Sequence, residues 1–206
     1  MKLIKRFRLS ASLNNALLIL ENNKYILIDA PNKIEKVIAY LEQENIILSE
    51  VWLTHCHYDH VLGLPLLKET YPKLKVYIAD EEMKGINDPN DNLLIKVKDN
   101  NFSYDGEILD NQLLLEEYPD LQMFYISGHS LKSTCYYFPN DNTVFAGDSL
   151  FRETIGRSDM IYGSQEKLIA GIKKHLLTLP KSTTVYPGHG FMTTIEHELA
   201  NNQVIK

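Results

Sequence analysis

Residues 55–60 carry a density of metal-binding side chains that is unusual for a short loop. This stretch, His55-Cys56-His57-Tyr58-Asp59-His60, directly follows a strand-like apolar run and residue Thr54. Imidazole nitrogens and carboxylate oxygens are ligands that zinc, iron and manganese ions accept in proteins. Alternation along an extended chain places His55 and His57 on one side, where both can bind one ion, whereas Asp59 and His60 point elsewhere and could bind a second. The alternative, a histidine-rich surface turn, explains one histidine more readily than three.

Three further candidate ligands follow apolar runs elsewhere in the chain. His129, Asp148 and His189 each come after a strand-like segment that is interrupted by a glycine. Glycine lets the backbone approach a crowded centre, and loops at strand ends commonly present catalytic groups on a rigid scaffold. Any one of these residues taken alone fits a turn or a buried core position. Their shared context favours a metal site that is assembled from distant parts of the sequence.

The order and spacing of these residues resemble those of the metallo-beta-lactamase superfamily over nearly the whole chain. The matching pattern is His55-x-His57-x-Asp59-His60, then His129, Asp148 and His189. The flanking strings Gly128-His129-Ser130, Phe145-Ala146-Gly147-Asp148-Ser149-Leu150-Phe151, Ile155-Gly156-Arg157-Ser158-Asp159 and Pro187-Gly188-His189-Gly190 are similar to those of glyoxalase II-like (hydroxyacylglutathione hydrolase-like) enzymes, in particular the compact bacterial group. The resemblance implies an α/β fold, the four-layer αββα sandwich, built as a single domain over residues 1–206.

The resemblance also implies a binuclear centre in which every ligand position is filled. The first ion would be held by His55, His57 and His129, and the second by Asp59, His60 and His189. Asp148 would bridge the two ions, and the catalytic carboxylates would be Asp148 and Asp59. Two divalent ions are expected, with zinc as the first expectation and iron or manganese as alternatives. Asp29 closes a strand in the same manner, and it would either orient a metal-binding histidine, as in the superfamily, or cap the following helix.

A pair of bound cations suits hydrolysis of a carbonyl compound. Such ions bring the pKa of a shared water near neutrality, which yields hydroxide at pH 7. The leading interpretation is a hydrolase of a hydroxyacyl thioester such as S-D-lactoylglutathione. One alternative is a mononuclear-iron persulfide dioxygenase, whose family shares much of the pattern and can carry cysteine where Cys56 stands. A lactonase-type or β-lactam hydrolase on the same centre is a further alternative.

Arg157 is the candidate substrate-binding residue. Its guanidinium suits a carboxylate-bearing thiol such as glutathione, as the basic residue does at this place in glyoxalase II, but it could equally pair with Asp159. The Pro-Gly-Gly of many short bacterial relatives is replaced by residues 160–163, Met-Ile-Tyr-Gly. Only a short segment follows His189 in this sequence, so no counterpart is expected of the helical domain that binds glutathione in eukaryotic-type enzymes. The thiol carrier therefore stays open.

Composition narrows the class of protein. The 206 residues include 21 basic and 27 acidic side chains, a formal charge of −6, and no basic patch, which argues against a nucleic-acid partner. Cys56 and Cys135 are the only cysteines, and their contexts indicate free thiols in a reducing compartment. No targeting segment or membrane span is visible, so the expected location is the cytoplasm and no membrane partner is expected. The oligomeric state is left open.

Periodicity predicts short strands separated by a few helices. The predicted strands cover residues 2–9, 16–20, 25–28, 51–53, 75–78, 108–109, 113–115, 121–126, 134–138, 143–146 and 183–186. The predicted helices cover residues 34–45, 60–71, a short segment capped by Asp80, 165–177 and 194–202. The polar, turn-rich segment 85–104 is expected to be a solvated loop. Each half of the chain thus runs from strands to helices, which fits the implied sandwich.

Overall fold

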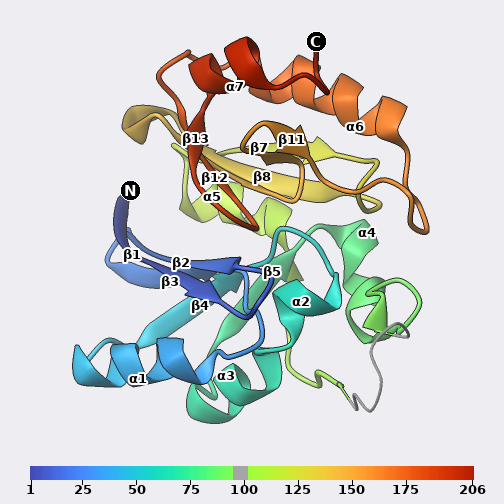
Figure 1. The fold of residues 1–206 in the computed structure, drawn as a ribbon. Helices are drawn as coiled ribbons and strands as arrows, with labels where there is room; N and C mark the ends of the chain where they lie inside the picture. The colour runs from blue at the N-terminus through green and yellow to red at the C-terminus, as the bar shows by residue number, and fades with distance from the viewer. Residues whose placement is uncertain (95–101) are drawn as a thin grey trace.

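The first half of the chain forms one sheet, with helices against its outer face. The computed structural model describes residues 1–94 and 102–206 (Figure 1). The strands lie in sequence order: β1 (Lys2–Leu9), β2 (Asn14–Glu21), β3 (Lys24–Ile28), β4 (Leu48–Trp52), β5 (Lys75–Ile78) and β6 (Ile108–Asp110). The first three are antiparallel and the rest continue in parallel. The β2–β3 turn uses Asn22 and Asn23, both with positive φ, as a tight hairpin turn requires.

The helices of this half differ in part from the prediction. They are α1 (Glu35–Gln43), α2 (Tyr58–Val61), α3 (Leu64–Thr70), α4 (Asp80–Met83) and the 3₁₀ turn η1 (Lys84–Asn87). The single helix predicted over residues 60–71 is wrong. The Gly63 backbone N–H donates to the Ala30 carbonyl at 2.7 Å and not to its own helix, and Pro65, near the start of α3, has no N–H to donate. Asp80 is the first residue of α4 and does not cap it, since Ala79 occupies the capping position.

The second half forms a five-stranded sheet in the order β13-β12-β9-β8-β7. Its strands are β7 (Gln122–Ile126), β8 (Ser133–Phe138), β9 (Thr143–Gly147), β12 (Thr184–Pro187) and β13 (Thr193–Thr194), and a small hairpin is formed by β10 (Leu150–Phe151) and β11 (Thr154–Ile155). The helices α6 (Gln165–Gly171) and α7 (Ile195–Asn201) lie on its outer side, and α6 continues into a π-helical turn, Ile172–Leu176 (Figure 1). The amphipathic helix predicted over residues 165–177 is therefore present, with a change of pitch.

The strand predicted at residues 113–115 is wrong. This segment forms the 3₁₀ turn η3 (Asn111–Leu113) and the helix α5 (Leu114–Glu117). The Asp110 side chain accepts a hydrogen bond from the Gln112 backbone N–H and so begins the turn. A three-leucine run is too short for periodicity to distinguish helix from strand.

The hydrophobic core has three parts, which confirms the four-layer αββα sandwich. Between the two sheets lie large aromatic side chains, including Trp52, Tyr136 and Phe145. A second cluster packs α1 and α3 against the first sheet, and a third packs α6 against the second. The layers are therefore helix, sheet, sheet, helix (Figure 1). No helix within residues 1–94 and 102–206 is long and apolar enough to cross a membrane.

The solvated loop expected at residues 85–104 is confirmed only in part: residues 87–90 are exposed, several others are buried, and residues 95–101 lie outside the described part. Ile86, Asn92 and Leu93 are buried. The Asn92 amide donates to the Ile86 carbonyl at 2.7 Å, and the Tyr58 backbone N–H donates to the Asn92 carbonyl at 2.7 Å. The segment therefore packs on the histidine-rich loop, because asparagine side chains replace the backbone partners that regular structure would supply.

Candidate metal centre

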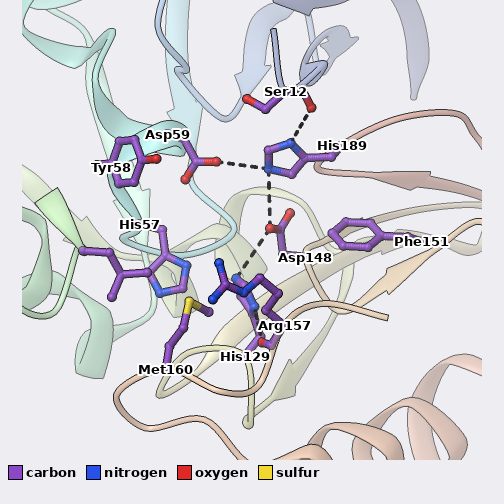
Figure 2. Close-up of a pocket in the computed structure, with 11 residues that line it drawn as sticks. Ser12, His57, Tyr58, Asp59, His129, Asp148, Phe151, Arg157, Met160 and His189 are labelled. Atoms are coloured by element: carbon purple, nitrogen blue, oxygen red, sulfur yellow. Dashed lines mark hydrogen bonds and ion pairs between the residues drawn. The ribbon is translucent and has the colours of Figure 1, made fainter. Parts of the chain in front are cut away.

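Four strand ends meet at one edge between the two sheets, and together they present all seven predicted ligands. The loop after β4 carries His55, His57, Asp59 and His60, while His129, Asp148 and His189 follow β7, β9 and β12. Their donor atoms form three groups, each within 4.8 Å: His55 with His57 and His129; His55 with His60 and Asp148; Asp59 with His60 and His189. Residues separated by up to 134 positions in the sequence, from His55 to His189, thus share one site. Figure 2 shows His57, Asp59, His129, Asp148 and His189 around it.

The first group consists of His55, His57 and His129. The rings of His55 and His57 lie 4.5 Å apart between centroids, and each lies within 4.8 Å of the His129 ring. The His129 Nδ1–H donates to the Arg157 carbonyl at 2.8 Å, which leaves Nε2 facing the His55 Nε2 at 3.2 Å. Burial lowers the pKa of His57 to about 3, and burial followed by the charge of His60 lowers that of His55. Both rings are therefore neutral, the form that binds a metal ion.

The second group consists of Asp59, His60 and His189. His189 Nδ1 donates to the Ser12 carbonyl at 2.9 Å, while its Nε2 lies 3.1 Å from Asp59 Oδ2. His60 Nδ1 lies 2.9 Å from Asp29 Oδ2. Burial raises the pKa of the Asp59 carboxyl, but His60 and His189 lower it by more, so Asp59 is a carboxylate. Each ring again has one nitrogen held by the protein and one directed into the site.

Asp148 lies between the two groups. Its Oδ1 is 3.4 Å from His60 Nε2, and its Oδ2 is 3.5 Å from the Nε2 atoms of both His129 and His189 (Figure 2). The side chain is buried, with 7% of its residue surface exposed. Burial raises the pKa of Asp148, but the surrounding imidazoles lower it by more, so that the net pKa is about 2. Gly188 makes this approach possible, since a Cβ there would overlap Asp148 Oδ1.

Two polar atoms at the middle of the site show that the donor set suits a cation. Among the described residues, His60 Nε2 and Asp148 Oδ1 are buried and form no hydrogen bond. Unpartnered buried polar atoms are rare and costly in native proteins. Both are ordinary ligand atoms for divalent transition metals. A cation between them would satisfy both, so the residues present fit a metal ion.

Asp29 contacts both the His60 ring and the backbone of Thr54. It has a φ of 61°, a left-handed conformation that aspartate tolerates. Its Oδ1 accepts the Thr54 backbone N–H at 2.8 Å, and its Oδ2 faces His60 Nδ1. The structure therefore places Asp29 against the ring of the candidate ligand His60, whereas α1 begins after Ile34 without a side-chain cap.

Two supporting residues were missed in the sequence. Asn14 donates through Nδ2 to Asp59 Oδ2 at 3.1 Å. Glu82 is buried and accepts hydrogen bonds from the Cys56 backbone N–H at 3.1 Å, the Ser130 hydroxyl at 2.5 Å and the Lys132 backbone N–H at 2.7 Å. Neither residue lies near a ligand in a recognisable motif, so spacing alone gave no signal for them.

A cavity of about 350 Å³ opens over both ligand groups, and Arg157 lines it. The Arg157 side chain is 68% exposed and pairs with Asp159 through two hydrogen bonds of 3.0 Å. The structure thus contains the predicted ion pair and also leaves the guanidinium within reach of the cavity. Cys56 belongs to none of the ligand groups found among the described residues. Its Sγ lies 3.9 Å from the Asp91 carbonyl, and burial raises the thiol pKa.

Comparison with known proteins agrees with the family resemblance seen in the sequence. The chain is 34% identical over 190 residues to a probable metallo-hydrolase of Streptococcus pyogenes serotype M6, covering 89% of this chain and 82% of that one. It is 33% identical over 181 residues to a hydroxyacylglutathione hydrolase of Pelagibacter ubique, covering 83% and 67%. The crystal structure of BLEG-1 B3 metallo-beta-lactamase superposes with a TM-score of 0.87 at 27% identity, covering 98% and 99%. The metallo-beta-lactamase superfamily profile matches residues 10–189, and the chain belongs to that superfamily.

Proposed function

We propose that this chain is a binuclear metal-dependent hydrolase of a thioester, with a hydroxyacyl thioester such as S-D-lactoylglutathione as the reference substrate. The observation that carries the proposal is the arrangement of two three-residue ligand groups on either side of Asp148. The similarity to a hydroxyacylglutathione hydrolase supports the thioester class. The relatives of the metallo-hydrolase type support hydrolysis more generally.

In this proposal the ligands divide as the geometry suggests. The first ion is held by His55, His57 and His129, the second by Asp59, His60 and His189, and Asp148 contacts both. Zinc is the proposed metal, and iron or manganese would be accepted by the same ligands. When bound, the ions supply hydroxide at neutral pH and polarise the substrate carbonyl.

The protein side chains supply orientation. Asp59 is ionised and lines the cavity, so its carboxylate can orient the attacking water by accepting a hydrogen bond from it. Asn14 donates to Asp59 Oδ2 and thereby fixes the direction of the carboxylate. Arg157 can exchange its exposed partner Asp159 for a carboxylate of the thiol carrier, because an exposed ion pair contributes little stability. Glutathione or another anionic thiol would satisfy this contact.

The first test is metal content followed by a thioester screen. We expect about two ions per chain after purification without chelator, and hydrolysis of S-D-lactoylglutathione or a related thioester. Asp59→Asn removes a proposed ligand of the second ion and the carboxylate that holds the attacking water. It should lower the metal content below two ions per chain and reduce kcat by about 10²-fold or more, since loss of even an outer partner of a ligand costs about 10- to 100-fold. Metal-loaded protein that hydrolysed no thioester across several thiol carriers would contradict the proposal.

The same metal-loaded protein can be tested for two other activities. The 0.87 TM-score to BLEG-1 B3 metallo-beta-lactamase makes β-lactam hydrolysis the second candidate, and turnover of a chromogenic cephalosporin tests it directly. A persulfide dioxygenase would instead contain a single iron and consume oxygen with glutathione persulfide. Absence of oxygen uptake would remove the dioxygenase.

We also propose a cytoplasmic location and no nucleic-acid or membrane partner. Both cysteines are free and buried, and burial raises the pKa of the Cys135 thiol to about 12, which suits a protein that is not disulfide-linked. The net charge of −6 supports the absence of a nucleic-acid partner. Cell fractionation with an antibody to the chain tests the location.

A further inference from the structure

One end of the cavity is lined by apolar side chains that the proposed metal chemistry does not use. Leu93 and Met160 both line the cavity. Figure 2 places Met160 beside His57, while Phe151 and His189 lie on the other side of Asp148. The apolar end therefore adjoins the first ligand group and can receive part of a substrate bound there.

The two segments that supply these side chains are fastened to each other. The Tyr162 hydroxyl donates to Asp91 Oδ1 at 3.1 Å, so the turn after Met160 is joined to the segment that precedes Leu93. The Gly163 backbone N–H donates to the Met160 carbonyl at 2.8 Å and closes that turn. The cavity wall formed by Leu93 and Met160 is therefore held in place by hydrogen bonds. Both of its segments lie outside the ligand motifs.

The backbone at Leu93 indicates that its side chain is held in place. Leu93 has a φ of 64°, in the left-handed region that leucine rarely adopts, and it is only 8% exposed. Such conformations persist where the surroundings impose them, often at ligand-binding sites. The neighbouring Asn92 supplies that constraint, since its amide donates to the Ile86 carbonyl and its side-chain oxygen accepts from the Leu94 backbone N–H.

The opposite end of the cavity leads onward. A second cavity of about 340 Å³ shares Ser12, Phe151 and His189 with the first and is also lined by Arg152. The Arg152 side chain is 50% exposed and its Nε lies 3.6 Å from Glu153 Oε1, and the Arg157 side chain is 68% exposed. A charged thiol carrier suits these exposed guanidinium groups better than the buried side chain of Leu93, because burying a charge without a partner is costly. The acyl part of the substrate would then lie toward Leu93 and Met160.

We propose that Leu93 and Met160 form an acyl-tail subsite, so that the preferred thioesters have hydrocarbon acyl chains longer than the lactoyl group. This inference rests on the proposed thioester hydrolysis and narrows its substrate class. The tail of the acyl group packs on the leucine and methionine side chains, and methionine adapts its shape to chains of different length. A hydroxyl near the carbonyl remains compatible with this placement, because only the tail enters the subsite.

The test is a series of glutathione thioesters with unbranched propanoyl, butanoyl, pentanoyl and hexanoyl groups. Burial of one methylene corresponds to about 4-fold in kcat/KM, so the unchanged protein should show a rise of that order per added carbon until the subsite is full. Met160→Gln keeps the length of the side chain and adds polarity, and Leu93→Asn keeps a residue that tolerates the left-handed backbone. Both variants should reduce the rise to less than 2-fold per carbon.

Ile161→Gln is the matched control, since Ile161 neighbours Met160, is exposed and does not line the cavity. It should keep the full dependence on chain length. An equal dependence in Met160→Gln, Leu93→Asn and the unchanged protein would overturn the subsite. So would a dependence that follows the apolar length of the thiol and ignores that of the acyl group.

Failure of the proposed function is distinguished by a binding measurement. If the metal-loaded protein hydrolyses no thioester, calorimetric titration with propanoate through hexanoate still tests the wall alone. Affinity that rises with chain length in the unchanged protein but not in Met160→Gln would sustain the apolar subsite without thioester hydrolysis. A constant affinity along the series would overturn it.

Discussion

At the scale of single residues, the nitrogen that does not face the metal site determines how each imidazole is used. His60 is the clearest case, because its Nδ1 faces Asp29 at 2.9 Å while its Nε2 is buried without a hydrogen bond. Asp29→Asn should weaken binding of the second ion by about 10- to 100-fold, the usual effect of losing such a partner. Competition with a coloured chelator measures the affinity, and Asp120→Asn, at an exposed position, is the control. Equal affinity in both variants would contradict the assigned contact.

Protons should compete with the second ion. Burial lowers the pKa of His60, but the carboxylates of Asp29, Asp148 and Asp59 raise it by more, so the net pKa is raised above 6.5. A raised pKa means that the metal-free ring keeps its proton as the pH falls, and the ion must displace that proton. Metal affinity should therefore decrease from pH 8 to pH 6, and the decrease should be smaller in Asp29→Asn. Chelator competition at each pH measures both slopes.

Gly188 tests how tightly Asp148 is packed. A methyl group there would overlap Asp148 Oδ1 and crowd His60. Gly188→Ala should therefore displace the carboxylate and reduce metal content to about one ion per chain or fewer, while far-ultraviolet circular dichroism stays unchanged. Retention of two ions would show that the carboxylate does not need this approach.

The residue scale was also where the sequence was most informative about the site. The seven candidate ligands could be singled out because their side chains are chemically distinctive and each follows a strand-like run, and the structure brings them together. Asn14 and Glu82 could not, because their function depends on a backbone group or carboxylate that only the folded chain brings near. Spacing along the chain carries no information on such contacts.

At the scale of elements, Glu82 in α4 connects two ligand loops from different sheets. It accepts from the Cys56 backbone N–H on one loop and from Ser130 and the Lys132 backbone N–H on the other. Glu82→Gln replaces one acceptor oxygen by an amide that cannot accept, so one loop loses its anchor. We expect weaker binding of the first ion with little change in the second. Cobalt substitution, followed by its visible spectrum during titration, separates the two ions.

The control for this element is Glu81→Gln. Glu81 is the neighbouring residue of α4 and is exposed, with an ion pair to Lys132. The Glu81→Gln variant should bind both ions normally. Equal cobalt titrations for Glu81→Gln and Glu82→Gln would exclude the connection.

Element boundaries could be predicted where the apolar pattern extends over many residues. The predictions were wrong where the pattern covers only a few. The strands and the helix at residues 165–177 follow clear apolar patterns. The predictions for residues 113–115 and 60–71 failed because a turn begun by Asp110, and a hydrogen bond from the Gly63 N–H to the Ala30 carbonyl, decided the local conformation. The prediction for segment 85–104 failed in part because the buried Asn92, a residue type that indicates a turn, holds its neighbours against the histidine-rich loop.

At the scale of the whole molecule, the ligands come from both sheets, so a bound ion joins the two halves. The backbone adds a link, since the Asn15 N–H donates to the Gly188 carbonyl at 2.7 Å. An ion present at 1,000 times its Kd stabilises the native state by about 4 kcal/mol. For a chain of this size that corresponds to a rise in Tm of roughly 10 °C.

Removing the metal should therefore lower the Tm by roughly 10 °C. Scanning calorimetry with and without a chelator measures the change, and Asp148→Asn should melt at nearly the same temperature in both conditions. An unchanged Tm in the original protein would mean that ions do not connect the sheets.

The fixed rings have a thermodynamic consequence for ion uptake. Hydrogen bonds to Asp29, the Ser12 carbonyl and the Arg157 carbonyl orient His60, His189 and His129 within the folded chain. The conformational entropy of these side chains is thus lost during folding and not during ion uptake. Ion uptake should resemble binding by a rigid chelator, with a heat-capacity change near zero, unlike small zinc domains that fold around their metal. Size and preferred geometry of the ion, and not folding energy, would then determine which metal this chain retains.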